Sequence, residues 1–123
     1  FIEQVAPGVV KISAFGFEAY YGGKDGIFVE RVAGDFSGGN DKLVIDVRTD
    51  QEAAAGVIRG ARHIPLEKLE DVAATLPQDK EVLIYCANGI RAEMAHQTLS
   101  QQGIPNRFLN ETVTIAKDGS FKI

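Results

Sequence analysis

The stretch "LIYCANGIRAEMAH", residues 83–96, decides the fold, because an apolar run, a short loop with a glycine and a helix-like run follow one another in it. Its first part belongs to "KEVLIYC", a continuous apolar run that is typical of a strand buried on both faces of a parallel sheet. Its last part belongs to "RAEMAHQTLSQQG", where Ala92, Ala95 and Leu99 fall on one helical face. The stretch therefore predicts a strand, a loop and a helix, with Cys86 at the carboxyl end of the strand.

The same alternation runs upstream, beginning at Lys42. "KLVIDV" predicts a second buried strand. "TDQEAAAG" predicts a short helix, since Thr49 and Glu52 have the spacing of a capping box and Gly56 can close the helix. "LEKLEDVAATLP" has its apolar residues on one stripe and ends at Pro77, which predicts another helix. We expect an α/β fold with a central parallel sheet flanked by helices.

The two ends of the chain have a different pattern. In residues 1–41, "VVKISAF" and "GIFVERV" predict a hairpin with "GGKDG" as its turn, and "FSGGND" predicts a loop. In residues 110–123, "KDG" predicts the turn of a second hairpin. We expect one domain over residues 1–123, with its core at about 42–109 and extra strand segments at both ends.

The composition excludes several classes of protein. The 123 residues include 13 Lys and Arg against 17 Asp and Glu, and the net charge of −4 argues against a nucleic-acid partner. No apolar run approaches the length of a membrane span. The single cysteine cannot form an internal disulfide, and no second cysteine or histidine is spaced to complete a zinc site. The chain begins with Phe1, so we expect a trimmed N-terminus, which leaves the cytoplasm and the periplasm both open.

The position of Cys86 indicates chemistry. Ligands of open parallel sheets collect beyond the carboxyl ends of the strands, where the next helix points its amino end. In the loop "ANGI", Gly89 can adopt a positive φ and let several backbone N–H groups converge. The helix that begins near Arg91 adds partial positive charge. We expect this loop to hold a thiolate or a larger anion.

A structural interpretation of the same cysteine competes with this one. A lone cysteine is often a small buried hydrophobic residue, and the preceding "VLIY" is apolar enough for a core. The strand end, the loop glycine, the following helix and Arg91 have no part in that interpretation. Their combination favours a nucleophile.

Two motifs carry a resemblance to a known family. "CANGIRA", residues 86–92, resembles the C-x-x-G-x-R-[S/A] loop of the rhodanese (thiosulfate sulfurtransferase) family, and "LVIDVRTDQEAAAGVIRGARHIP", residues 43–65, is similar to a second block of that family. Together they cover roughly residues 42–109. Val57 stands where the family commonly has histidine and Arg59 where proline is usual. A different tail replaces the Gly-Gly and tryptophan segment that commonly closes the domain.

The resemblance implies a fold and a reaction. The fold would be the rhodanese-like parallel sheet with flanking helices. The Cys86 thiolate would take sulfur from a donor such as thiosulfate, store it as a persulfide and pass it to a thiol or to cyanide. No metal or cofactor is implied, and a protein partner stays open. The candidate residues are Cys86 as the catalytic residue, Ala87, Asn88, Gly89, Ile90 and Arg91 for substrate binding, and Asp46 and Arg48 for structural support.

The roles of the charged residues leave alternatives. Arg91 either faces the incoming anion or braces the loop through backbone carbonyls. In "DVR", Asp46 and Arg48 could form an ion pair that ties the strand end to the next helix through Glu52. We expect this pair to be structural rather than catalytic.

The remaining polar candidates receive smaller roles. Asn88 is expected to shape the loop rather than contact substrate. His63 and His96 are expected to be incidental, with His96 on a polar helix face.

Three other functions stay open: a cysteine-loop phosphatase, a catalytically silent binding module and a redox-sensing thiol. Cysteine phosphatases generally have five residues between cysteine and arginine, whereas four separate Cys86 from Arg91. A loop that retains its cysteine argues against the catalytically silent binding module. A redox switch would usually need a resolving cysteine, which this chain lacks.

Overall fold

The computed structural model describes the chain except for residues 1, 7–8, 13–19, 23–31 and 38–40. Its main sheet has seven strands, which lie side by side in the order β1 (Ile2–Ala6), β2 (Val9–Ile12), β3 (Tyr20–Tyr21), β7 (Asn106–Leu109), β6 (Glu81–Tyr85), β4 (Lys42–Asp46) and β5 (Arg62–His63). The five strands from β3 to β5 run parallel, while β1 and β2 add an antiparallel edge. The predicted α/β fold with a central parallel sheet is confirmed.

Helices connect the parallel strands. The described ones are α2 (Asp50–Ala54), α3 (Leu66–Val72) with the 3-10 turn η1 (Ala73–Thr75), α4 (Ile90–Gln101) and a helical stretch at residues 32–36. The predicted capping box is present, since the Thr49 side chain accepts from the Glu52 backbone and the Glu52 side chain accepts from the Thr49 backbone. In the described part of the chain, every helix is too short or too polar to cross a membrane.

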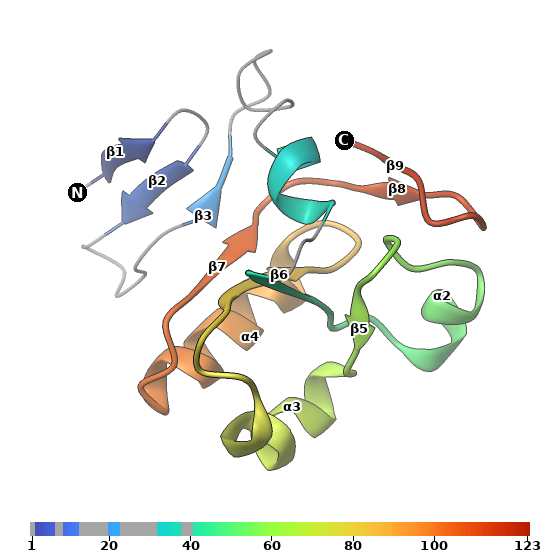
Figure 1. Cartoon of the computed structure of the whole chain (residues 1–123). Helices are drawn as coiled ribbons and strands as arrows, with labels where there is room; N and C mark the ends of the chain where they lie inside the picture. Colours follow the sequence, from blue (N-terminus) through green and yellow to red (C-terminus); the bar gives the residue numbers. More distant parts are fainter. Residues whose placement is uncertain (1, 7–8, 13–19, 23–31, 38–40) are drawn as a thin grey trace.

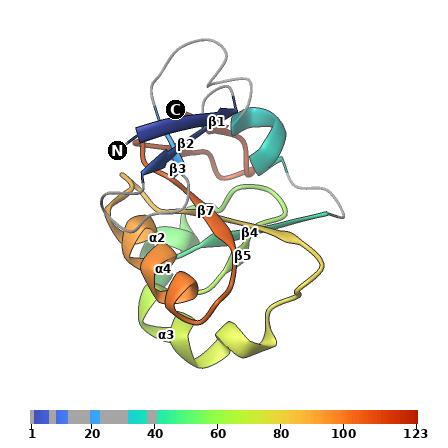
Figure 2. The ribbon, with the colours of Figure 1, turned by 90° about the vertical axis from the view of Figure 1, so that its left-hand side faces the viewer.

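The sheet separates two apolar cores, because successive side chains of a strand point to opposite faces. Leu43 and Ile45 of β4 pack with α3 and α4, whereas Val44 packs with residues 32–36 and the C-terminal segment. Figure 1 shows α3 and α4 below the sheet and the C-terminal hairpin above it. Figure 2, turned by 90°, shows α3 and α4 together on one side. Both faces of β4 and β6 are therefore buried, as their apolar sequences predict.

The C-terminal hairpin is confirmed. β8 (Thr114–Ile115) pairs with β9 (Phe121–Lys122), and Phe121 packs on the second core. The backbone N–H of Arg59 donates to the carbonyl of Gly119 at 3.0 Å. Proline, which is usual at position 59 in the resembled family, has no N–H and could not make this bond. The departure at Arg59 and the unusual tail thus belong to one contact.

The predicted N-terminal hairpin is wrong in its pairing. Val9 and Val10 of β2 pair with β1 on one edge and with β3 on the other, so neither of these residues is left for the predicted partner strand. Val32 lies in a helical stretch and not in a strand, and it is buried together with Phe36, one helical turn later. The remaining residues of both predicted strands, 13–15 and 26–31, lie outside the described residues.

The position predicted for His96 is also wrong. Its side chain is fully buried, with Nδ1 2.5 Å from Asn106 Oδ1 and its ring 5.0 Å from the ring of Phe108. Asn106 and Phe108 belong to β7, so this side chain faces the sheet. A polar partner on the neighbouring strand makes burial of the imidazole tolerable.

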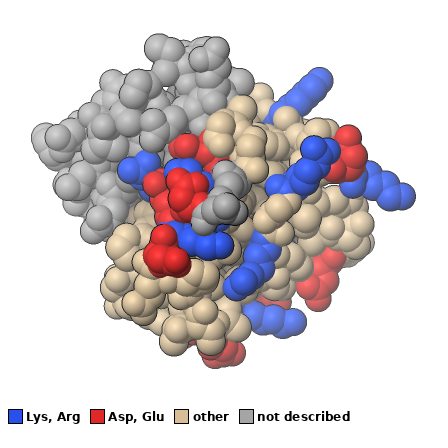
Figure 3. All heavy atoms as spheres, viewed as in Figure 1, with Lys and Arg blue, Asp and Glu red and all other residues tan. Residues whose placement is uncertain are grey.

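Charged side chains of both signs are mixed on the surface. On the face drawn in Figure 3, basic and acidic side chains stand side by side. One described cluster of this kind is formed by Lys42 with Asp35, Asp41 and Glu81, at distances of 3.5 to 3.9 Å. Among the described residues on this face, neither sign of charge forms a large patch of its own.

Candidate active site

Cys86 follows the last residue of β6 directly. Asp46, the last residue of β4, is in register with Tyr85, and the N–H of Val47 donates to the carbonyl of Tyr85 at 3.1 Å. The carboxyl ends of the two central strands therefore meet at one edge of the sheet. Continued by one residue, this register places Cys86 beside Val47, and the cysteine itself is fully buried.

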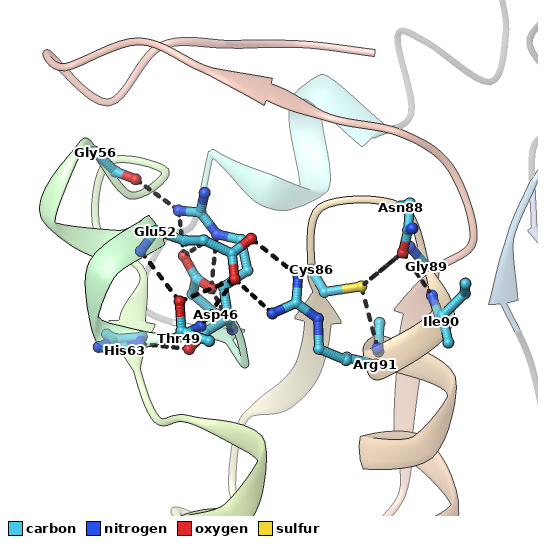
Figure 4. Close-up of polar contacts among 12 residues, drawn as sticks. Asp46, Thr49, Glu52, Gly56, His63, Cys86, Asn88, Gly89, Ile90 and Arg91 are labelled. Carbon is cyan, nitrogen blue, oxygen red and sulfur yellow. Dashed lines mark hydrogen bonds and ion pairs between the residues drawn. The ribbon is translucent and has the colours of Figure 1, made fainter.

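The loop turns its backbone N–H groups toward the sulfur. Gly89, with φ +97°, donates its N–H to Cys86 Sγ at 3.0 Å, and the N–H of Ala92 donates to the same atom at 3.3 Å. Asn88 Oδ1 accepts from the N–H of Ile90 at 3.2 Å, which fits the predicted loop-shaping role, and it also lies 3.9 Å from Cys86 Sγ. Figure 4 shows the sulfur turned toward the first turn of α4. Two amide dipoles and the helix terminus thus favour negative charge on Sγ.

The segment after β7 braces the loop from outside. A Cβ atom built on Gly89 would lie 2.9 Å from Asn110 Cα and 2.7 Å from its Oδ1. The N–H of Val113 donates to the carbonyl of Ala87 at 3.0 Å. Glycine is therefore needed at position 89 both for its positive φ and for the close approach of Asn110. The sequence patterns did not predict this bracing.

Arg91 forms a bidentate ion pair with Glu52. Its Nη1 and Nη2 lie 2.6 and 2.9 Å from the two carboxylate oxygens, and the side chains are 29% and 34% exposed. Glu52 is held by the capping box, with Oε1 3.2 Å from the N–H of Thr49. In Figure 4 the guanidinium lies on the Glu52 side of Cys86, while Sγ points toward Gly89. The brace thus runs through a carboxylate rather than through backbone carbonyls.

This ion pair is stable at neutral pH. The hydrogen bond from Arg91 lowers the pKa of Glu52 to about 2, and the same hydrogen bond raises the pKa of Arg91. Both groups therefore stay charged well beyond the physiological range. The pair ties the start of α4 to α2, and with it the loop between Cys86 and Arg91.

The pair leads to a prediction about pH. Because its folded-state pKa is depressed, Glu52 adds stability above its unfolded pKa of about 4.3, and that stability is lost as pH falls toward 2. Solvent screening limits the contribution to about 0.5–1 kcal/mol. Urea unfolding of wild type and Glu52→Gln should therefore differ by a constant free energy above about pH 5, and the difference should shrink toward acid pH. A pH-independent difference would contradict the pair's role.

The predicted ion pair of Asp46 and Arg48 is confirmed. Arg48 Nε and Nη2 donate to the Asp46 carboxylate at 3.0 and 2.8 Å, and Asp46 is fully buried. The predicted link through Glu52 is wrong, because Arg48 Nη2 donates instead to the carbonyl of Gly56, just after α2, at 2.6 Å. Glu52 points to Arg91, as described above. The pair joins the end of β4 to the end of α2. Among the described residues, no hydrogen bond connects it to Cys86 Sγ.

The buried Tyr85 and the partly exposed His63 complete this polar cluster. The Tyr85 hydroxyl donates to Asp46 Oδ2 at 2.8 Å and accepts from the N–H of Ile58 at 2.9 Å. Burial raises the pKa of Tyr85. His63 Nε2 lies 2.7 Å from the carbonyl oxygen of Arg48. His63 is thus a structural partner of the strand end rather than an incidental residue.

A family model now decides the classification. The model of the rhodanese-like domain matches residues 29–119, which is most of the chain and includes the whole site. The chain belongs to the rhodanese-like domain family. The resemblance of "CANGIRA" and of residues 43–65 is confirmed by this match.

Curated relatives of the domain carry sulfurtransferase names. A sulfurtransferase of Allochromatium vinosum is 39% identical over 70 residues, which cover 57% of this chain and 64% of the relative. A putative sulfurtransferase of Bacillus subtilis is 38% identical over 60 residues, covering 49% of this chain and 58% of the relative. The matched region is thus less than two thirds of the length of these relatives.

Solved structures agree on the fold. The protein SSP1007 of Staphylococcus saprophyticus matches with a TM-score of 0.61 and 30% identity, covering 68% of this chain and 84% of that one. A rhodanese-like domain protein of Staphylococcus aureus matches with a TM-score of 0.61 and 25% identity, covering 68% and 82%. Both matches support the rhodanese-like α/β fold.

The site of this rhodanese-like domain contains residues that sequence reasoning missed. The loop from Cys86 to Arg91 forms as one unit, as predicted, and Asp46 and Arg48 lie at the same sheet edge. Ala92, Glu52 and Asn110 were not predicted as parts of the site. Across the described ranges, no group of three or more His, Cys, Asp or Glu side chains could hold a metal ion.

Proposed function

We propose that this rhodanese-like domain is a sulfurtransferase that carries sulfane sulfur on Cys86. The observation that supports this most directly is the pair of backbone N–H groups, from Gly89 and Ala92, directed at Sγ. A nucleophile held in this way is stabilised as an anion without any titratable partner. The sulfurtransferase names of the relatives point in the same direction.

The proposed reaction has two displacements. The Cys86 thiolate attacks the outer sulfur of a donor such as thiosulfate, the S–S bond of the donor breaks, and sulfite leaves with the electron pair. A thiol or cyanide then attacks the outer sulfur of the Cys86 persulfide, and Sγ leaves as a thiolate. Sulfite is a good leaving group, so the first step requires no general acid.

The loop from Ala87 to Arg91 is proposed to surround the transferred sulfur with its backbone. We assign the Arg91 side chain to positioning this loop, because its two terminal nitrogens, Nη1 and Nη2, both donate to the Glu52 carboxylate. This assignment makes Glu52 and Arg91 one functional unit.

Kinetics can separate positioning from direct donor binding. If Arg91 acts through Glu52, Arg91→Ala and Glu52→Gln should raise the KM for thiosulfate by the same factor of about 2 to 5, and the double variant should add little. Steady-state assays with a cyanide acceptor measure these constants. A KM raised by Arg91→Ala alone would assign the guanidinium to the donor instead.

The phosphatase alternative makes a different prediction. A phosphoryl group brings three oxygens around phosphorus and needs a wider ring of donors than one sulfur atom, while the loop has only four residues between Cys86 and Arg91. We expect turnover of thiosulfate and none of an aryl phosphate, tested side by side with wild type. Cys86-dependent release of the phenol, without sulfur loading, would reverse the assignment.

A further inference from the structure

Two large apolar side chains of α4 are exposed beside the reactive cysteine. Ile90 is 65% exposed and Met94 is 52% exposed, and they are the large hydrophobic side chains that stand out in this way among the described residues. They are four residues apart on α4, so they lie on one helical face. Neither belongs to the two apolar cores. Folding of the described chain therefore does not explain them.

Their position connects them to the chemistry. Ile90 is the first residue of α4, and the N–H groups on both sides of it, those of Gly89 and Ala92, bind Cys86 Sγ. Figure 4 shows Ile90 on the side of Cys86 opposite to Glu52. The exposed Ile90 side chain thus belongs to the same short segment whose N–H groups bind the sulfur.

The exposed face continues along α4 with uncharged side chains, and the half-buried Glu93 lies at its border. Gln97 and Gln101 follow Met94 at helical spacing, and both are exposed. On the other side of the loop, the charge of Arg91 is already engaged by Glu52. A face bordered by a carboxylate favours neither RNA nor another polyanion, whereas exposed isoleucine and methionine favour an apolar contact.

We propose that Ile90 and Met94 form a docking surface for a protein sulfur acceptor whose cysteine thiol stands next to an apolar side chain. The inference rests on the proposed function, because it concerns the second displacement at Cys86. Two exposed side chains provide far less area than the roughly 800 Å² per partner that a stable interface buries. The surface therefore suits a transient complex rather than a stable dimer of this chain. Methionine adapts its shape readily, which suits a transient partner.

The transfer step is balanced within the two proteins. The acceptor thiol loses its proton to water, and its thiolate attacks the outer sulfur of the Cys86 persulfide. A new S–S bond forms on the acceptor, the bond to Sγ breaks, and Sγ keeps the electron pair as a thiolate. The sulfur changes carrier, so no external oxidant or reductant is required.

The test separates loading from transfer. The protein is first loaded with thiosulfate and desalted, and sulfur on Cys86 is measured by intact mass. The rate of sulfur discharge is then measured with three acceptors. Two are capped peptides with one cysteine, flanked by leucine in one peptide and by serine in the other. The third is cyanide, a small acceptor. Wild type should discharge to the leucine-flanked peptide about fivefold faster than to the serine-flanked one.

Met94→Ser should remove this preference, while loading and discharge to cyanide stay at wild-type rates. Met94→Leu should restore the preference, and Gln101→Ser, on the same face but farther from Cys86, is the matched control and should leave it unchanged. Ile90 belongs to the loop, so Ile90→Ser is judged only by the ratio of the two peptide rates, which should approach one.

The outcomes are distinguishable. Failure to load sulfur would overturn the proposed function and this inference with it. Normal loading with equal rates for both peptides, or with an unchanged preference in Met94→Ser, would overturn the docking surface alone. So would a dimer in size-exclusion chromatography that Met94→Ser dissociates, because the face would then belong to a second copy of the chain.

Discussion

Replacing Cys86 with serine should abolish sulfur transfer, by about a thousandfold or more, and leave the fold intact. The hydroxyl of serine stays protonated at neutral pH and cannot store sulfur as a persulfide. Serine is close to cysteine in size and can accept the N–H groups of Gly89 and Ala92, so we expect a change in unfolding free energy within about 1 kcal/mol.

Two measurements check this prediction. The transfer of sulfur from thiosulfate to cyanide reports activity, and urea unfolding reports stability. Cys86→Ser with full activity would remove the cysteine from the mechanism. Loss of activity together with a large loss of stability would make the variant uninformative about chemistry, and Cys86→Ala, which lacks any nucleophile, then serves as the second variant.

Replacing Gly89 with valine should damage both activity and stability. Valine is β-branched and is strained at φ +97°, and its Cβ would lie 2.9 Å from the Asn110 backbone. The loop must then shift, which moves the N–H of Gly89 away from Sγ. We expect a loss of about 3 kcal/mol in unfolding free energy and about a hundredfold in transfer rate.

Gly103 offers a matched control for this experiment. It also has a positive φ, +76°, but a Cβ built on it meets no heavy atom within 4 Å. Gly103→Val should therefore show only the cost of the backbone conformation, about 1–3 kcal/mol, with transfer by the folded protein near wild type. Equal loss of activity in the two variants would mean that the geometry around Cys86 is not the reason for glycine at position 89.

The parts of the fold that local patterns specify were predicted from the sequence. The continuous apolar runs of β4 and β6, the capping box of α2 and the apolar stripe of α4 each contain their own signal. The site followed from topology, because parallel strands bring their carboxyl ends to one edge. That rule predicted Cys86 and its loop at a ligand-binding edge, whereas the structure shows that the strand end with Asp46 meets the same edge.

Contacts between distant segments could not be predicted in this way. Glu52 and Arg91 are 39 positions apart, and the capping pattern that identified Glu52 gave no sign of its second partner. Asn110, which lies close to Gly89, belongs to the C-terminal segment 110–123, where the sequence does not follow the family pattern. His96 looked polar and exposed because its burial depends on Asn106 across the helix–strand contact. The first two cases are tertiary pairings with no local periodicity, whereas His96 has the helical spacing of the buried Ala92 and Leu99 and was misjudged by its polarity.

The central claim is that Cys86 carries sulfur as a persulfide, and intact mass after incubation with thiosulfate tests it most directly. Wild type should gain the mass of one sulfur atom, a thiol reductant should remove it, and Cys86→Ser should show no gain. An unchanged mass in wild type under conditions of excess thiosulfate, or a gain that persists in Cys86→Ser, would contradict the account.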